Sequence, residues 1–165
     1  MTVLCYQTLR RLQIVEPFEE RTRAFGLTYG LGPCGIDIRI ADSILLPPGG
    51  FALVSSFERF NMPADVMAVV HDKSTWARTG LLVQNTVIEP GWKGYLMLEL
   101  TNHLRPSWWR SLFNRRSNYN YIRLQHGMPI AQIVFHRLDE PTHLPYAGKY
   151  QDQRRGTPAI LEGPE

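Results

Sequence analysis

The strongest strand pattern of the chain is Tyr95-Leu96-Met97-Leu98-Glu99-Leu100-Thr101, at residues 95–101. Successive side chains of a strand point to opposite faces, so the three leucines share one face. The other face carries Glu99, together with Tyr95, Met97 and Thr101. The leucine face predicts contact with the core, and the surroundings of the second face decide what Glu99 does. Glu99 either points to water or lines a pocket or a subunit interface, where it can shuttle a proton.

Short apolar runs punctuated by Pro and Gly continue on both sides of this strand. They predict strands at residues 35–40, 45–46, 51–55, 63–70, 81–83, 86–88, 121–124 and 130–136. A short helix within residues 3–15 and a loop at 30–33 complete the pattern. About nine short strands with tight turns favour an all-β fold, a distorted barrel or jelly roll, in a single domain over residues 1–165.

The composition is that of an ordinary globular domain of 165 residues, 44% of them hydrophobic. The net charge of +3 suits an anionic small molecule but is too weak to favour nucleic acid. Cys5 and Cys34 form no CxxC pair, which indicates a reducing, cytoplasmic location. No run approaches the ~18 apolar residues of a membrane span, so we expect no membrane association.

Two segments depart from the strand pattern. Residues 105–120 are basic and aromatic, which predicts an insertion. It either stacks bases or meets a membrane surface, or else it elaborates the surface or forms an oligomer contact. Residues 146–165 are rich in Gly, Gln and Arg, which predicts a mobile C-terminal lid that is ordered by a ligand or neighbour, or else a solvated end.

Candidate ligand-binding residues lie at two places. Ser74 and Thr75 stand between Lys73 and Arg78, and hydroxyls, turn N–H groups and two cations can together hold phosphate oxygens. The alternative is an ordinary helix cap with solvated charges. Glu89 opens the turn Glu89-Pro90-Gly91-Trp92, where it either caps the turn or binds a sugar hydroxyl.

Five segments occur in an order that resembles a known family: residues 34–39, 63–65 with 73–78, 89–99, 127–132 and 146–153. Together they resemble the dCTP deaminase branch of the dUTPase-like superfamily, over residues 30 to 160. The resemblance implies a homotrimer of distorted β-barrels (the β-clip) with active sites at subunit interfaces. It also implies dCTP as substrate, dUTP and ammonia as products, and Mg²⁺ bound through the triphosphate.

The resemblance further implies roles for single residues. Glu99 would activate the attacking water, Ser74 would orient it, and Arg78 would neutralise the triphosphate with Lys73 and Thr75. Glu89 would meet the deoxyribose 3′-OH, and the backbone of Met97 would read the base. The lid residues would be Tyr146, Lys149 and Gln153. Zinc is not expected, because zinc deaminases need a P-C-x-x-C pair that Cys5 and Cys34 do not form.

The chain also departs from the family pattern. Lys73 stands where the family has Arg, so a bidentate grip on phosphate is lost there. Glu89 stands where the family has Asp, and it is one methylene longer. Two other functions therefore stay open: a dUTP pyrophosphatase, alone or combined with deamination, and a non-catalytic nucleotide sensor or protein-binding module.

Overall fold

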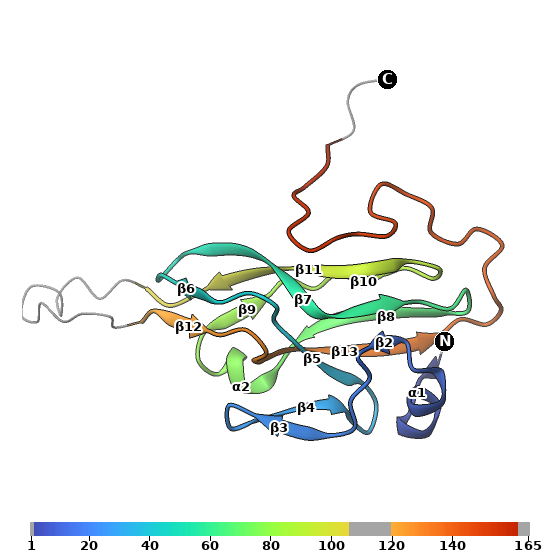
Figure 1. Ribbon diagram of the computed structural model, residues 1–165, viewed down its shortest axis with the longest axis horizontal. Helices are drawn as coiled ribbons and strands as arrows, with labels where there is room; N and C mark the ends of the chain where they lie inside the picture. The colour runs from blue at the N-terminus through green and yellow to red at the C-terminus, as the bar shows by residue number, and fades with distance from the viewer. Residues whose placement is uncertain (1, 106–119, 162–165) are drawn as a thin grey trace, which may run out of the picture.

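The computed structural model describes residues 2–105 and 120–161, in which strands far outnumber helices (Figure 1). The elements are β1 (Thr2–Val3), α1 (Tyr6–Leu12), β2 (Val15–Glu16), β3 (Thr22–Ala24), β4 (Leu27–Leu31), β5 (Ile36–Arg39), β6 (Ile44–Leu46), β7 (Phe51–Asn61), β8 (Val66–Asp72), α2 (Ser74–Ala77), β9 (Leu81–Val83), β10 (Val87–Ile88), β11 (Lys93–Asn102), β12 (Ile122–Leu124) and β13 (Pro129–Arg137). The prediction of an all-β domain is confirmed.

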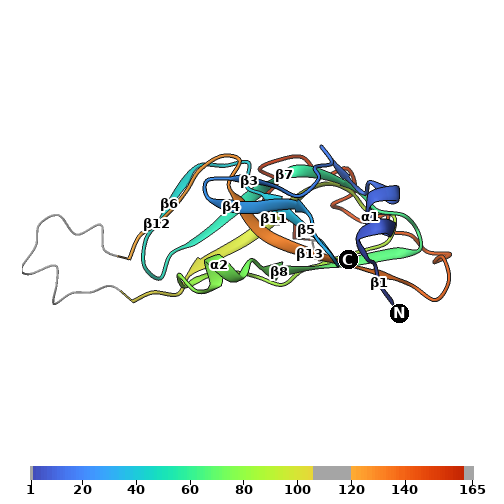
Figure 2. The same ribbon diagram turned by 90° about the horizontal axis from the view of Figure 1, so that it is seen from below.

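The strands form two curled sheets and one separate antiparallel pair. The larger sheet runs β10-β8-β13-β5-β4-β3, with β1 also paired to β13; the smaller runs β2-β7-β11-β9; β12 pairs with β6. The view from below shows the sheets wrapping around a common interior, as the predicted distorted barrel requires (Figure 2). Ile40 forms an isolated bridge with Ser56, which joins the end of β5 to β7 and so closes the two sheets on each other.

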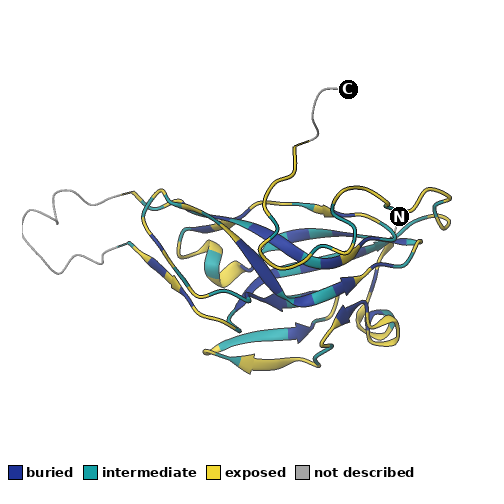
Figure 3. Cartoon of the chain, turned by 45° about the horizontal axis from the view of Figure 1, so that its top comes forward, coloured by how far each residue is buried: buried dark blue, intermediate teal, exposed yellow. Residues whose placement is uncertain are grey.

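The core lies between the sheets, and its residues are the dark strand interiors of Figure 3. From β11 it takes Leu96, Leu98 and Leu100, which are buried as the alternation predicts. From the larger sheet it takes Ile38, Val70, Ile133 and Phe135, all fully buried. Burial of these branched and aromatic side chains removes apolar surface from water, which is the main force that holds the sheets together.

One strand irregularity shapes the outer surface. Between the pairs Tyr95↔Arg59 and Met97↔Ser55, β11 has one residue, Leu96, whereas β7 has three, residues 56–58. The N–H of Leu96 donates to the Ser56 hydroxyl at 2.9 Å instead of to a backbone carbonyl. The side chain therefore satisfies a group that the bulge would otherwise leave unpaired. The sequence pattern predicted a strand only over residues 51–55, but β7 continues through this bulge to Asn61.

Two other sequence predictions need correction. The predicted helix is shorter than residues 3–15, because Thr2 and Val3 pair with β13 and Val15 pairs with Phe60. The predicted loop at 30–33 begins two residues later, at Gly32, because β4 extends through Leu31 and pairs with β5. In both cases pairing with another strand overrides the local pattern.

The predicted insertion falls mainly on residues 106–119, which lie outside the described residues. Its two ends are held together by amides. Asn102 is fully buried and donates to the carbonyls of Asn120 (2.7 Å) and Leu46 (3.1 Å), and Asn120 donates to the Arg105 carbonyl (2.8 Å). Within the described residues, no helix is long and apolar enough to cross a membrane.

Candidate active site

The outer face of β11 forms the floor of a cavity of about 460 Å³. Its walls come from β7, from the segment around β10, and from the C-terminal tail, which lies above β11 in Figure 1. The lining residues are Phe51, Leu53, Thr86, Val87, Ile88, Glu89, Trp92, Leu96, Met97, Glu99, Tyr146, Tyr150, Gln153, Thr157, Pro158 and Ala159. The cavity is therefore mostly apolar, with two carboxylates in its wall.

Glu99 is the polar centre of this cavity. Its neighbour across the sheet is Leu53, and its carbonyl accepts the N–H of Gln84 at 2.9 Å, which holds the backbone in the ladder. Its Oε2 atom is buried and has no hydrogen-bond partner among the described residues. A buried carboxylate oxygen without a donor is costly, so this atom is ready to accept a hydrogen bond from a ligand or water.

The C-terminal tail is fastened along the edge of the cavity. Trp92 donates from Nε1 to the Tyr150 carbonyl at 2.7 Å, and the N–H of Tyr95 donates to the Gln153 carbonyl at 2.9 Å. Gln151 bonds twice to the β11 end of the barrel, from its Nε2 to Gly91 O and through its Oε1 to Lys93 N. Residues 146–157 thus lie against their own subunit, and the predicted lid role stays a prediction.

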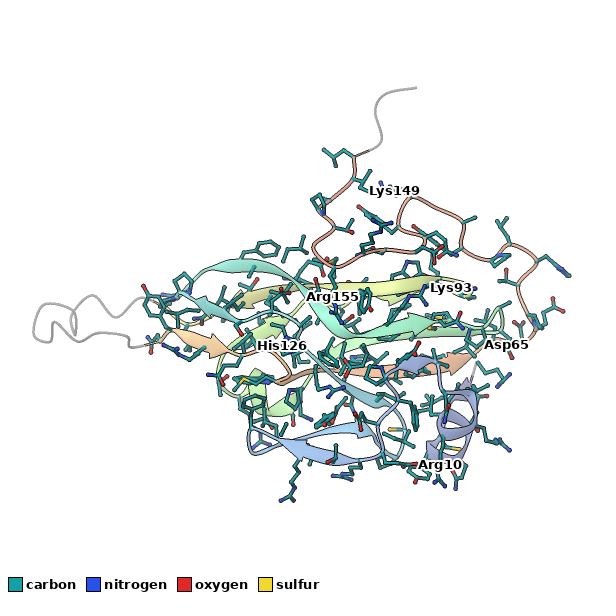
Figure 4. The ribbon with its side chains drawn as sticks, viewed as in Figure 1. Arg10, Asp65, Lys93, His126, Lys149 and Arg155 are labelled. Carbon is teal, nitrogen blue, oxygen red and sulfur yellow. The ribbon has the colours of Figure 1, made fainter. Side chains whose placement is uncertain are left out.

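Arg155 anchors the tail at the bulge of β7. Its guanidinium carbon lies 4.2 Å from the centre of the Tyr95 ring and 5.7 Å from that of Phe57, and its Nη2 donates to the Phe57 carbonyl at 2.7 Å (Figure 4). On the Phe57 ring lies a second guanidinium, that of Arg39, at 4.2 Å. A cation over an aromatic face is attracted by the ring, so these stacked side chains hold the tail, β7 and β5 together.

Beneath this stack Arg39 is paired with a buried carboxylate, Glu58. Arg39 donates to Glu58 from Nε at 2.7 Å and from its backbone N–H at 2.9 Å. Burial raises the pKa of Glu58 above its ordinary value, and the contacts with Arg39 offset only part of that shift. The second carboxylate near Arg39 is that of Glu19, which lies 3.9 Å from Nη2.

We expect the raised pKa of Glu58 to make the fold less stable as the pH rises. The folded chain holds the Glu58 proton more tightly than the unfolded chain does. The free energy of unfolding therefore falls through the interval between the ordinary pKa and the raised one. Urea unfolding across that interval should show a downward slope that is flatter in Glu58→Gln. Equal slopes in the two proteins would contradict the assignment, and the exposed Glu16→Gln serves as control.

The structure places the predicted site residues in three parts of the molecule: the cavity, the tail and the α2 segment. Five of them line the one cavity: Glu89, Met97, Glu99, Tyr146 and Gln153. Lys149 stands on the tail, with its Nζ 5.5 Å from the Tyr150 ring centre (Figure 4). The remaining four, Lys73, Ser74, Thr75 and Arg78, lie on or beside α2, below β11 in Figure 1, and do not line the cavity.

The α2 segment presents its polar groups outward. Ser74, Thr75 and Arg78 are exposed, whereas Trp76 is half-buried and donates from Nε1 to the Pro129 carbonyl at 2.6 Å. Lys73 is 8% exposed, and its ammonium lies 2.6 Å from Oδ2 of Asp37. The two hydroxyls and the guanidinium thus lie on the surface, where they can bind an anion from outside this subunit.

Sequence reasoning missed several residues of the cavity. Tyr150 and Trp92 were recognised only as part of motifs, although the Trp92 indole holds the tail. Phe51 and Leu53 were recognised as strand residues, but their exposure beside Glu99 was not predicted. The alternation of β7 puts both on the Glu99 face once its register with β11 is known, and the sequence alone does not supply that register.

Among the described residues, no group of three or more His, Cys, Asp or Glu is placed to hold a metal ion. The sequence model of a protein family described as dCTP deaminase-like matches residues 34–138. This range includes α2, β10 and β11. The chain belongs to the dCTP deaminase-like family.

Similar sequences of this family span nearly the whole chain. It is 31% identical to a dCTP deaminase of Acidobacterium capsulatum, covering 86% of this chain and 87% of that protein. It is 33% identical to a dCTP deaminase of Campylobacter fetus (91% of both chains) and 32% identical to one of Thermococcus sibiricus (87% of both).

Solved structures of dUTPases share the fold of this chain. The dUTPase of phage phi11 of S. aureus superposes with a TM-score of 0.57, at 16% identity, over 81% of this chain and 92% of that one. The native EIAV dUTPase superposes with a TM-score of 0.51, at 20% identity, over 70% and 84%. At this level of identity the likeness establishes the dUTPase-like fold of this dCTP deaminase-like chain.

Proposed function

We propose that this protein hydrolytically deaminates dCTP to dUTP and ammonia. The observation that carries the proposal is the unpartnered, buried Oε2 of Glu99 in an apolar cavity beside β11. The family supports the choice of reaction, since its similar members are dCTP deaminases. A mostly apolar cavity with a single buried carboxylate suits a flat heterocycle that must exchange protons at one atom.

In the proposed reaction Glu99 acts as base and then as acid. Its carboxylate takes a proton from a water molecule as the water oxygen bonds to C4 of cytosine. The electron pair of the C4–N3 double bond moves to N3 as the water oxygen adds. Glu99 then gives its proton to the amino nitrogen, and the C4–N bond breaks to release ammonia. The second proton of the water passes from the C4 hydroxyl to N3, which leaves a carbonyl at C4. One water is consumed and one ammonia released, so atoms and charge balance. Only one group is needed, because the tetrahedral centre is reached and left by proton transfers of opposite direction.

The other cavity residues fit the proposed nucleoside. Met97 is next to the β7 bulge and 8% exposed, so its backbone lies at the cavity floor where a base edge can be read. Glu89 stands at the end of β10 and is exposed, which suits the 3′-OH of the deoxyribose. Tyr146, Lys149 and Gln153 belong to the tail, and we assign them to closing the site over the nucleotide.

We further propose that the active form is a homotrimer. Ser74, Thr75 and Arg78 do not line the cavity of their own subunit, so a neighbouring subunit must bring its α2 to Glu99 for the triphosphate to be held. The face around Glu99 suits such a contact, because the apolar side chains of Phe51, Leu53 and Leu82 are 63%, 39% and 37% exposed there. Rings of identical subunits close with one interface repeated.

In this assembly Ser74 orients the attacking water, and Arg78 with Thr75 holds phosphate oxygens. Their hydroxyl and guanidinium groups are donors, which fits phosphate rather than a cation. Mg²⁺ belongs to the proposal as a partner of the triphosphate, held by phosphate oxygens. When bound it neutralises part of the phosphate charge. A structural Mg(II) ion is known from a dUTPase of phage phi11 of S. aureus, which shares the fold.

The test is a product assay with purified protein and Mg²⁺, first with dCTP and then with dUTP. dUTP and ammonia should accumulate in equal amounts from dCTP, and dUTP itself should stay intact. Glu89 lines the same cavity as Glu99, so conversion through to dUMP and pyrophosphate would make the protein bifunctional. Binding of dCTP without turnover would favour the nucleotide-sensor function and refute the deaminase.

A further inference from the structure

We propose that Lys73 is a positioning residue, which holds the α2 segment through Asp37, and is not a ligand of the triphosphate. The proposal rests on the proposed function, since it concerns the segment assigned to the phosphates. Lys73 is the residue before α2, and its ammonium lies 2.6 Å from Asp37 Oδ2. Its side chain is 9% exposed and that of Asp37 is 19% exposed, so the pair is largely withdrawn from solvent.

Asp37 is a fixed point in the barrel. It lies in β5, with Gly30 of β4 and Gln132 of β13 as its register partners on either side. Its other carboxylate oxygen, Oδ1, is buried and has no hydrogen-bond partner among the described residues. If Lys73 turned outward to a phosphate, the Asp37 carboxylate would stay buried without its cation. A buried charge left alone in this way is strongly destabilising, so the pair resists being broken.

Lys73 also sets the first turn of α2. Its carbonyl accepts the N–H groups of Trp76 (2.9 Å) and Ala77 (3.1 Å). The segment is thereby held at two points, by the Lys73 ammonium on β5 and by the Trp76 indole on β13. Between and after these anchors stand the exposed residues Ser74, Thr75 and Arg78. The two anchors, Lys73 and Trp76, thus fix the segment, and the exposed residues remain available to the ligand.

The charges agree with this division of roles. The positive charge of Lys73 is balanced at 2.6 Å by Asp37, so it adds little field at the α2 surface. Arg78 is exposed, and it forms no ion pair with a carboxylate of the described residues. Replacement of the family's Arg by Lys at this position therefore costs the chain no phosphate ligand, because an ammonium suffices to pair with one carboxylate oxygen.

A double-mutant cycle tests the proposal. The variants are Lys73→Met, Asp37→Asn, the double variant, and Lys73→Arg as the conservative replacement. The readouts are kcat and KM for dCTP, and the Kd values for dCTP and dCMP by calorimetry. A misplaced catalytic segment can cost about 100-fold in rate, so we expect each single variant to lower kcat/KM by about 10- to 100-fold. The double variant should be no worse than the poorer single one.

Three further results are expected of a positioning residue. Asp37→Asn should be as harmful as Lys73→Met. The ratio of the dCTP and dCMP Kd values should stay within about twofold of the wild type, because no phosphate contact is lost. The Lys73→Arg variant should retain most of the wild-type activity. The exposed pair Arg10–Glu20, 2.7 Å apart, is the control: Arg10→Met and Glu20→Gln should leave both readouts unchanged.

The opposite pattern would overturn the proposal. If Lys73 binds phosphate, Asp37→Asn frees its ammonium and keeps or tightens dCTP binding, whereas Lys73→Met weakens dCTP more than dCMP. No effect of either single variant would overturn it as well. Should Lys73→Met fail to fold, Lys73→Gln replaces it in the same cycle. Wild-type turnover is measured first: its absence refutes the proposed function, while the cycle is still read from nucleotide binding.

Discussion

Glu99→Gln is expected to lower kcat for dCTP by about 10²- to 10⁴-fold, the range that one general acid–base group contributes. Glutamine keeps the length of the side chain and its place in the β11 wall of the cavity. It cannot take a proton from water at neutral pH, so neither the attack at C4 nor the protonation of the leaving nitrogen is assisted. The loss therefore falls on kcat, and the Kd for dCTP should change by less than about threefold.

The measurement combines steady-state ammonia release with calorimetric binding of dCTP. Glu140→Gln is the matched control, since Glu140 is exposed on the segment that follows β13. Its kcat should equal that of the wild type. Residual activity of Glu99→Gln within tenfold of the wild type would exclude Glu99 as the proton-transfer group and would direct attention to Glu89, the other carboxylate of the cavity.

Mixing two inactive variants is expected to restore activity. Glu99→Gln and Arg78→Ala each remove one half of the proposed site, and loss of a charge-stabilising donor such as Arg78 costs about 10²- to 10³-fold. In the trimer each site takes the carboxylate from one chain and the guanidinium from its neighbour. A trimer that contains both variants, in the ratio 2:1 or 1:2, has one such site with both groups intact, so about a third of the sites should be active.

The experiment uses co-expressed chains with different affinity tags, purified over both tags so that every assembly is mixed. The specific activity should rise from about 1% of the wild type or less to tens of per cent. A control mixture pairs Glu99→Gln with the double variant Glu99→Gln/Arg78→Ala, and it should stay inactive. Activity of the first mixture that never exceeds the average of its two variants would show that each chain builds its site alone.

The two experiments address different parts of the proposal. Glu99 is located by the geometry of a single subunit, because Glu99 lines the cavity and its Oε2 is buried without a partner among the described residues. The contribution of Arg78 depends on assembly, because α2 stands away from that cavity. A failure of the mixing experiment would thus leave the role of Glu99 intact and revise only the source of the phosphate site.

Much of the fold was predictable from local patterns. The alternation over residues 95–101 correctly predicts that Leu96, Leu98 and Leu100 are buried and that Glu99 lies on the other face. The strands β9 and β12–β13 were also predicted nearly to the residue. Alternation depends only on the strand's own two-residue period, so it can be read without knowing the partner strand.

The bulge of β7 at residues 56–58 could not be predicted in this way. It exists because β5 approaches β7 at the Ile40–Ser56 bridge, and because Glu58 turns inward to pair with Arg39. Both partners are distant in the sequence. The bulge in turn presents the Phe57 carbonyl and ring to Arg155, which fastens the tail beside the cavity.

By itself the sequence determined the all-β class, the face on which Glu99 lies, and the turn that carries Ser74, Thr75 and Arg78. These are properties of short segments, set by side-chain periodicity and by residue types that favour turns. Only the tertiary structure decided that the tail lies over β11, that Lys73 is paired with Asp37, and that α2 faces away from the cavity. Such contacts join residues that strand pairing brings together, and pairing partners are chosen by burial across the whole chain.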